Sequence, residues 1–184
     1  DKGLFLLPIK NGHYVIVKGK GYTDIPEINT EPISFTSRLD FPLTSSTVGS
    51  SEMQHLDYAH AIGLIEHFVG EGDLFLTIRG RKYTPEFQFS VGKNSIMQKG
   101  VQTEVDAGFE GKDVVILIEA KNMKMNNIII RQLYYPYRKW KIDTGKKVIP
   151  LFFEKRGLDY MMWMYEFTDE LDYNSIQLVK SAKY

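Results

Sequence analysis

The sequence contains no cysteine, so neither a disulfide framework nor a thiolate metal site is available to it. No apolar run approaches the roughly 20 residues that a helix needs to cross a bilayer. The first residues also lack the basic segment followed by an apolar stretch that marks a secretion signal. These absences favour a cytoplasmic protein with no membrane partner, because a chain without cysteine suits a reducing compartment.

Net charge is also lacking. Lysine plus arginine and aspartate plus glutamate each total 23, so the overall charge gives no support to nucleic-acid binding. The charge distribution is more informative, since ten basic residues stand against two acids between residues 121 and 156. These basic residues are Lys121, Lys124, Arg131, Arg138, Lys139, Lys141, Lys146, Lys147, Lys155 and Arg156. Such a block is typical of contacts to a phosphate backbone, but acids folded back from residues 159–172 would make it an ordinary charged helix face.

Length and composition indicate one folded domain. The 184 residues suffice for a sizeable core, and the 43% of hydrophobic and 13% of aromatic residues exclude a disordered chain. The chain begins at Asp1 rather than at a methionine, so we expect a fragment or a processed product. An additional N-terminal domain that is missing from the chain is therefore a hypothesis.

Turn and cap signals divide the chain into an α/β order. Asn11-Gly12 lies between two apolar runs and predicts a hairpin with a type I′ turn, whereas residues 19–50 predict loop with short strands. Ser51 and Gln54 form a capping box, which predicts a helix that ends at Gly70. The later patterns predict strands at 73–79, 85–91, 101–107 and 113–120, a helix at 126–141, and strands at 147–154, 160–167 and 176–180.

The most informative segment is the apolar run Val114–Ile118, which ends in Glu119-Ala120-Lys121. The string Glu-x-Lys is common, because roughly one match is expected in a chain of this length. A second copy, Glu110-Gly111-Lys112, falls in a predicted turn, where charged side chains are solvated. The copy at Glu119 closes a buried strand instead, where carboxylates are costly unless they are paired, protonated or bound to metal. The alternative is that these charges reach solvent from a strand end.

Strand geometry groups further charges with Glu119. Side chains alternate across a sheet, so Glu119 and Lys121 share one face. If Gly111-Lys112 forms a two-residue hairpin turn, Glu104 lies opposite Glu119 and Asp106 points to the same face. A one-residue bulge would break this register.

With Asp106 on one strand, Glu119-Ala120-Lys121 at the end of the next, and a helix directly after, the sequence resembles the PD-(D/E)XK nuclease superfamily, in particular type II restriction endonucleases. The resemblance covers about a third of the chain strongly. Val105 stands where many members have proline, and Pro136 replaces the tyrosine of a Gln-x-x-x-Tyr pattern that begins at Gln132.

This resemblance implies an α/β fold with an αβββαβ core, in which helices flank a mixed central sheet. Residues 51–184 would form this nuclease core. Residues 1–50 would form a β-rich N-terminal extension packed on it.

The resemblance also implies roles for individual residues. Asp106 and Glu119 would bind Mg²⁺ with the carbonyl of Ala120, and Lys121 would position or activate the attacking water. Glu66, on the first helix, and Glu104 are candidate additional acids. Four residues of the basic block and its helix are candidate contacts to the DNA backbone, namely Lys124, Arg131, Gln132 and Arg138.

The implied activity is Mg²⁺-dependent hydrolysis of double-stranded DNA by a restriction enzyme, which commonly acts as a homodimer. Two alternatives stay open. One is a repair or junction-cleaving nuclease, and the other is a DNA-binding or interaction module that keeps the fold without catalysis.

Overall fold

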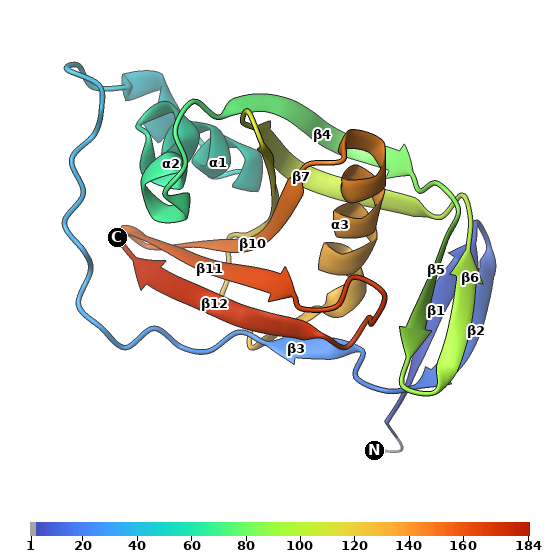
Figure 1. Cartoon of the computed structure of the whole chain (residues 1–184). Helices are drawn as coiled ribbons and strands as arrows, with labels where there is room; N and C mark the ends of the chain where they lie inside the picture. The colour runs from blue at the N-terminus through green and yellow to red at the C-terminus, as the bar shows by residue number, and fades with distance from the viewer. Residues whose placement is uncertain (1–2) are drawn as a thin grey trace.

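The computed structural model describes residues 3–184 and shows an α/β protein built on a mixed six-stranded sheet (Figure 1). The strand order is β12-β11-β10-β8-β7-β4, and β8 and β10 are its parallel pair. Helix α3 (Ile130–Thr144) makes the crossover between them, as parallel neighbours require. The strands are β4 (Phe75–Tyr83), β7 (Gln102–Glu110), β8 (Val114–Lys121), β10 (Lys147–Arg156), β11 (Asp159–Phe167) and β12 (Ile176–Lys183).

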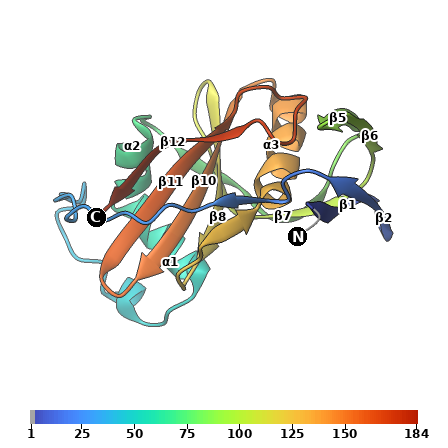
Figure 2. The ribbon, with the colours of Figure 1, turned by 90° about the horizontal axis from the view of Figure 1, so that it is seen from below.

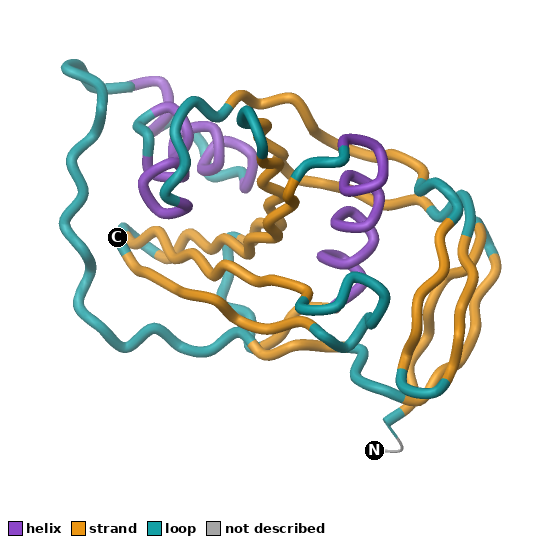
Figure 3. The backbone as a smooth tube through the Cα atoms, viewed as in Figure 1, coloured by secondary structure: helices purple, strands orange, loops and turns teal. Residues whose placement is uncertain are grey.

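Helices cover both faces of this sheet (Figure 3). On one face lie α1 (Glu52–Ala61) and α2 (Leu64–Val69), which pack on a cluster that includes Ile116 and Ile118. On the other face α3 packs on a cluster that includes Val115 and Leu117. Alternate residues of β8 are thus buried in two different cores, one on each face of the sheet, which explains its continuous apolar run.

Three two-stranded pairs and a 3-10 turn, Thr44–Thr47, complete the described chain. In Figures 1 and 2 the hairpin β1–β2 lies beside the hairpin β5–β6, and the loop after β3 runs along the molecule toward α1. The pairs are β1 (Leu4–Lys10) with β2 (His13–Lys18), β3 (Tyr22–Asp24) with β9 (Asn127–Ile129), and β5 (Phe87–Val91) with β6 (Asn94–Gln98).

The N-terminal segment packs against the rest of the protein. The hydroxyl of Tyr135 donates to the carbonyl of Pro8 at 2.7 Å, and the indole N–H of Trp163 donates to the carbonyl of Pro26 at 2.8 Å. None of the helices within residues 3–184 is long and apolar enough to cross a membrane.

Two local expectations need correction. The helix predicted from Ser51 to Gly70 breaks at Gly63, whose left-handed φ of 86° separates α1 from α2, although Ser51 does accept the N–H of Gln54 at 3.1 Å. The Asn11-Gly12 hairpin forms, but its turn is not type I′. Gly12 alone of the two has a positive φ, and type I′ requires it at both positions.

Arg138 is a further correction, because its side chain is buried, whereas the expected contact to a DNA backbone needs an exposed side chain. Its Nη1 donates to the carbonyls of Gln88 and Glu170 and to the hydroxyl of Tyr134, at 3.3, 2.7 and 3.0 Å. The guanidinium also lies 4.8 Å from the ring centre of Phe87. Arg138 therefore joins α3 to the segments around β5 and Glu170.

We expect Arg138→Leu to lower the free energy of unfolding by about 3 kcal/mol, because it leaves buried acceptors without a donor. In a chain of this length that corresponds to a melting temperature lower by about 6–12 °C. Thermal denaturation followed by circular dichroism measures this, with the exposed Arg81→Leu as the matched control. A variant with normal melting and weakened DNA binding would instead restore Arg138 as a backbone contact.

Candidate active site

A bulge in β7 sets the position of Asp106. Gly80 pairs with Val105 and Ile78 with Gly108, so two residues of β7 oppose a single residue of β4 between these pairs. Bulges of this kind redirect side chains and interrupt the ladder. Here the carboxylate of Asp106 accepts the backbone N–H of Ala120 at 2.8 Å, which ties the bulge to the end of β8.

The register of β7 and β8 differs from the expected one. Glu110 pairs with Val115, two residues away from its expected partner Asp113, because the turn is longer and closes with a bond from the N–H of Gly111 to the carbonyl of Val114. A shift of two residues keeps each side chain on its face. Consequently Glu119 still points toward the side where Asp106 emerges.

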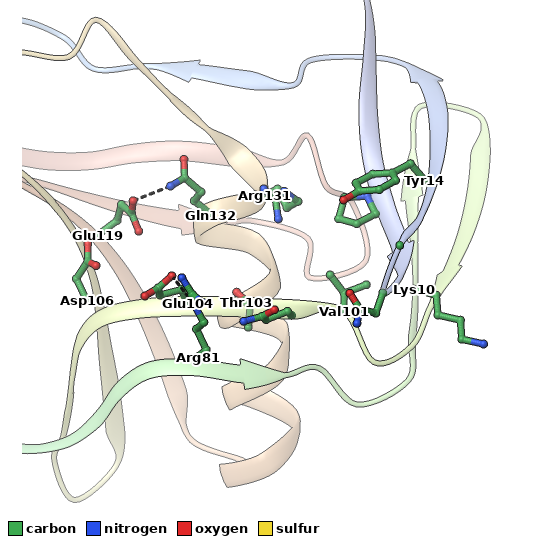
Figure 4. Close-up of a pocket in the computed structure, with 14 residues that line it drawn as sticks. Lys10, Tyr14, Arg81, Val101, Thr103, Glu104, Asp106, Glu119, Arg131 and Gln132 are labelled. Carbon is green, nitrogen blue, oxygen red and sulfur yellow. Dashed lines mark hydrogen bonds and ion pairs between the residues drawn. The ribbon is translucent and has the colours of Figure 1, made fainter.

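Asp106, Glu119 and Glu104 line one cleft, as Figure 4 shows. The cleft has a volume of about 520 Å³ and lies between β7, the start of α3 and the hairpin β1–β2. Asp106 and Glu119 stand next to each other at one end of it. Glu104 carries less free charge, because Arg81 donates to it at 3.2 Å across the β4–β7 pair.

Glu119 is the most perturbed acid of the cleft. Its side chain is buried, and its Oε1 accepts hydrogen bonds from Gln132 at 2.6 Å and from Lys121 at 2.8 Å. Burial raises the pKa of Glu119 to about 7, because it removes water from the carboxylate; the Lys121 bond opposes this rise, and the charges of Asp106 and Glu52 add to it. A cation placed here would relieve this cost.

Lys121 adjoins Glu119 but is not among the residues that line the cleft. Its Nζ donates to Oε1 of Glu119 and, at 2.7 Å, to the carbonyl of Ala120. Burial lowers the pKa of Lys121, but the bond to Glu119 and the charges of Glu119, Asp106 and Glu52 outweigh burial, so the net pKa is raised. Lys121 is therefore a firmly protonated donor beside the carboxylate pair.

The first helix supplies a different acid from the expected one. Glu66 lies on α2 outside the cleft, where it pairs with Arg38 at 3.0 Å and His60 at 3.3 Å. The break at Gly63 separates it from the helix that approaches β8. Glu52, at the start of α1, accepts the N–H of Asn122 at 3.3 Å and raises the pKa of Glu119 through its charge. The sequence does not indicate this contact, because it depends on how α1 packs on β8.

Most of the basic block is neutralised locally. Lys124 pairs with Glu27 at 2.5 Å, and six of the ten basic residues form ion pairs with acids in the described chain. The six are Lys121, Lys124, Lys139, Lys141, Lys146 and Arg156. Among the expected DNA contacts, Gln132 is engaged with Glu119, whereas Arg131 lines the cleft and forms no ion pair within residues 3–184. Arg131 is thus the basic residue of α3 that is best placed to meet a ligand.

The carboxylate pair offers few protein ligands for a metal ion. Within the part of the chain that the structure describes, no group of three or more histidine, aspartate or glutamate side chains forms a metal-binding cluster. A divalent cation at Asp106 and Glu119 would need ligands from water or substrate as well.

Comparison with known sequences places the chain in a family. The sequence model of a domain of unknown function, DUF6997, matches residues 17–184. The chain belongs to the DUF6997 family. No curated protein and no solved structure matches it. The DUF6997 match includes all strands of the six-stranded sheet and the carboxylate pair, but it begins within β2.

Proposed function

We propose that this protein is a Mg²⁺-dependent endonuclease of the PD-(D/E)XK type that hydrolyses phosphodiester bonds in DNA, in the first instance as a type II restriction enzyme. The observation that carries the proposal is the meeting of Asp106 and Glu119 at one end of an open cleft, with Lys121 bonded to Glu119. The pKa of Glu119 indicates that the pair is suited to a cation, because an isolated buried carboxylate favours its neutral form.

The element order supports the same proposal. With α2, the hairpin β5–β6 and the short strand β9 set aside, α1, β4, β7, β8, α3 and β10 follow one another as helix, three strands, helix and strand. The carboxylates and the lysine lie on β7 and β8, which are the second and third strands of that series. We therefore propose a restriction-endonuclease-like core for residues 51–184.

The donor set fits Mg²⁺. This hard cation is usually held by one or two carboxylates, with water and substrate phosphate oxygens completing its shell. Asp106 and Glu119 would supply the carboxylates, and the carbonyl of Ala120 would add a ligand, since an oxygen that already accepts from Lys121 keeps a second lone pair. When bound, Mg²⁺ acidifies water and neutralises charge on the phosphate.

The reaction adds water across one phosphodiester bond. The water oxygen forms a bond to phosphorus, the leaving sugar oxygen departs with the electron pair of the broken bond, and a proton ends on that oxygen. Lys121 would donate to the phosphate or orient the water, and it remains charged throughout the neutral pH range because its pKa is raised. Gln132 holds Glu119 in place from α3.

A cleavage assay tests the proposal. We expect the protein to cut phage and plasmid DNA with Mg²⁺ and to leave it intact in EDTA. Discrete bands on a gel indicate a site-specific restriction enzyme, and cutting confined to branched DNA indicates a junction or repair nuclease. DNA binding without cleavage under any of several divalent cations would contradict the proposed activity and favour a binding module.

A further inference from the structure

One face of the hairpin β1–β2 is apolar and exposed. Leu6 pairs with Ile16 across the hairpin and Pro8 with Tyr14, so these side chains share a face. The exposed fractions are 53% for Leu4, 64% for Leu6, 62% for Tyr14 and 70% for Ile16. We call these four residues the hairpin face. Contiguous exposed apolar groups of this kind mark a contact surface, since folding alone leaves them no reason to gather.

The hairpin is also purely basic. Lys10, Lys18 and Lys20 are exposed, and residues 3–23 contain no aspartate or glutamate. None of the three lysines forms an ion pair within the part of the chain seen in the structure, in contrast to most of the block at 121–156. Lys18 lies directly opposite Leu4, at the edge of the hairpin face. The apolar surface is thus framed by free positive charge.

The hairpin face continues into the cleft that holds the carboxylate pair. Tyr14, Lys10 and Arg131 line the cleft together with Glu119, and Figure 4 shows Tyr14 and Lys10 at the opposite end from Glu119, with Arg131 between them. A linear ligand that passes Glu119 would therefore meet Arg131 next and Tyr14 after it. The path therefore runs from the carboxylate pair, past the cation of Arg131, to the aromatic ring of Tyr14.

We propose that the cleft and the hairpin face bind an unpaired segment of a nucleic-acid strand, with its phosphates near Arg131 and the lysines and its bases against Tyr14, Leu6 and Ile16. Aromatic and apolar side chains stack on bases only where the base faces are free. A duplex hides these faces within its own stack and offers phosphates and base edges instead, which polar side chains contact. This inference rests on the proposed nuclease activity. Within that activity it favours the repair or junction-cleaving enzyme over the restriction enzyme, because the substrate it implies is DNA with a single-stranded part, such as a flap, fork or junction.

The charge pattern favours this occupant over a second copy of the chain. A symmetric dimer places the same patch on both partners, which would bring the lysines of the two hairpins against each other. A polyanion with exposed base faces complements both the lysines and the apolar residues. Nucleic acid therefore fits the whole surface, whereas a second copy fits its apolar part alone.

Fluorescence anisotropy in EDTA tests this binding without cleavage. We expect the full chain to bind a fluorescein-labelled 20-nucleotide oligothymidylate about tenfold more tightly than a blunt duplex of equal length. Tyr14→Ala should weaken binding of the single strand about tenfold, because it removes one stacking platform, and Tyr14→Phe should retain the affinity. Phe75→Ala is the matched control, since Phe75 is 65% exposed and pairs with Glu110 at the far end of β4.

Salt dependence tests the cationic part separately. Replacing both Lys18 and Lys20 with alanine should reduce the slope of log affinity against log salt by about 1.4, because each neutralised phosphate of a single strand contributes about 0.7. Lys112→Ala, a lysine in the exposed turn after β7, should leave the slope unchanged.

Three results would overturn the inference: equal affinity for duplex and single strand, unchanged binding by both Tyr14→Ala and Ile16→Ser, or a dimer by light scattering that either variant converts to monomer. Circular dichroism checks folding, and the second variant keeps the test valid if the first unfolds. Failure of the proposed function is distinguishable, because it appears as absent cleavage in Mg²⁺ while binding in EDTA persists. Cleavage without a preference for unpaired strands removes this inference alone.

Discussion

We expect Asp106→Asn and Lys121→Met each to lower the rate of the proposed Mg²⁺-dependent DNA cleavage by at least about 10²–10³-fold, the usual cost of losing one preorganised charge at a phosphate. Asparagine keeps an oxygen that accepts the N–H of Ala120, so the bulge persists while the negative charge is lost. Methionine keeps the length of Lys121 without its charge. Single-turnover cleavage of a linear DNA measures both rates.

The lysine of the second Glu-x-Lys string and the aspartate directly after it provide matched controls for these variants. Lys112 and Asp113 lie exposed in the turn between β7 and β8, so Lys112→Met and Asp113→Asn should cleave at the parental rate. Full activity of Asp106→Asn or Lys121→Met would remove that residue from the mechanism. Equal loss in the turn variants would show that general charge, rather than the site, controls the rate.

We expect the free energy of unfolding of the metal-free protein to fall as pH rises from about 4.5 to about 7, because of Glu119. The pKa of Glu119 is about 7 in the folded chain because of burial, against 4.5 when it is unperturbed. Between these two pH values the folded state binds more protons than the unfolded state. Raising the pH through this range therefore lowers the free energy of unfolding. The difference corresponds to about 3 kcal/mol at most.

Glu119→Gln cannot ionise and should escape this loss. In EDTA, urea denaturation at pH 8 should show the variant more stable than the parent by about 2–3 kcal/mol, and the advantage should disappear near pH 4.5. Glu104→Gln, which changes an exposed carboxylate of the same cleft, is the control. If Glu119→Gln is no more stable than the parent at pH 8, burial does not raise the pKa of Glu119 as the site requires.

The sequence was sufficient to predict the elements whose signals are local. The strand β8 was predicted correctly, because its continuous apolar run is a signal that neighbouring residues carry by themselves. The cap at Ser51 was correct for the same reason. The break at Gly63 was not anticipated, since a glycine within a helical pattern is compatible with either a helix or a stop.

The candidate site was predictable only in part. The alternation of strand residues placed Glu119 toward the cleft, and an even register shift preserved that side. The contacts of Glu52 and Arg138 depend on tertiary packing, because one meets the end of β8 and the other enters a pocket of carbonyls from distant segments. The free charge of the basic block depends on packing as well, because acids such as Glu27 and Glu170 fold back onto it and pair with Lys124 and Lys141.

The way in which the N-terminal segment closes over the sheet has a consequence for biosynthesis. The indole of Trp163 and the hydroxyl of Tyr165 bond to Pro26 and Asp24, across 137 and 141 residues of sequence. Such contacts raise the contact order, which slows folding. On the ribosome, residues 24–26 cannot form these two bonds until β11 has emerged. During that interval their apolar side chains remain open to chaperones and proteases.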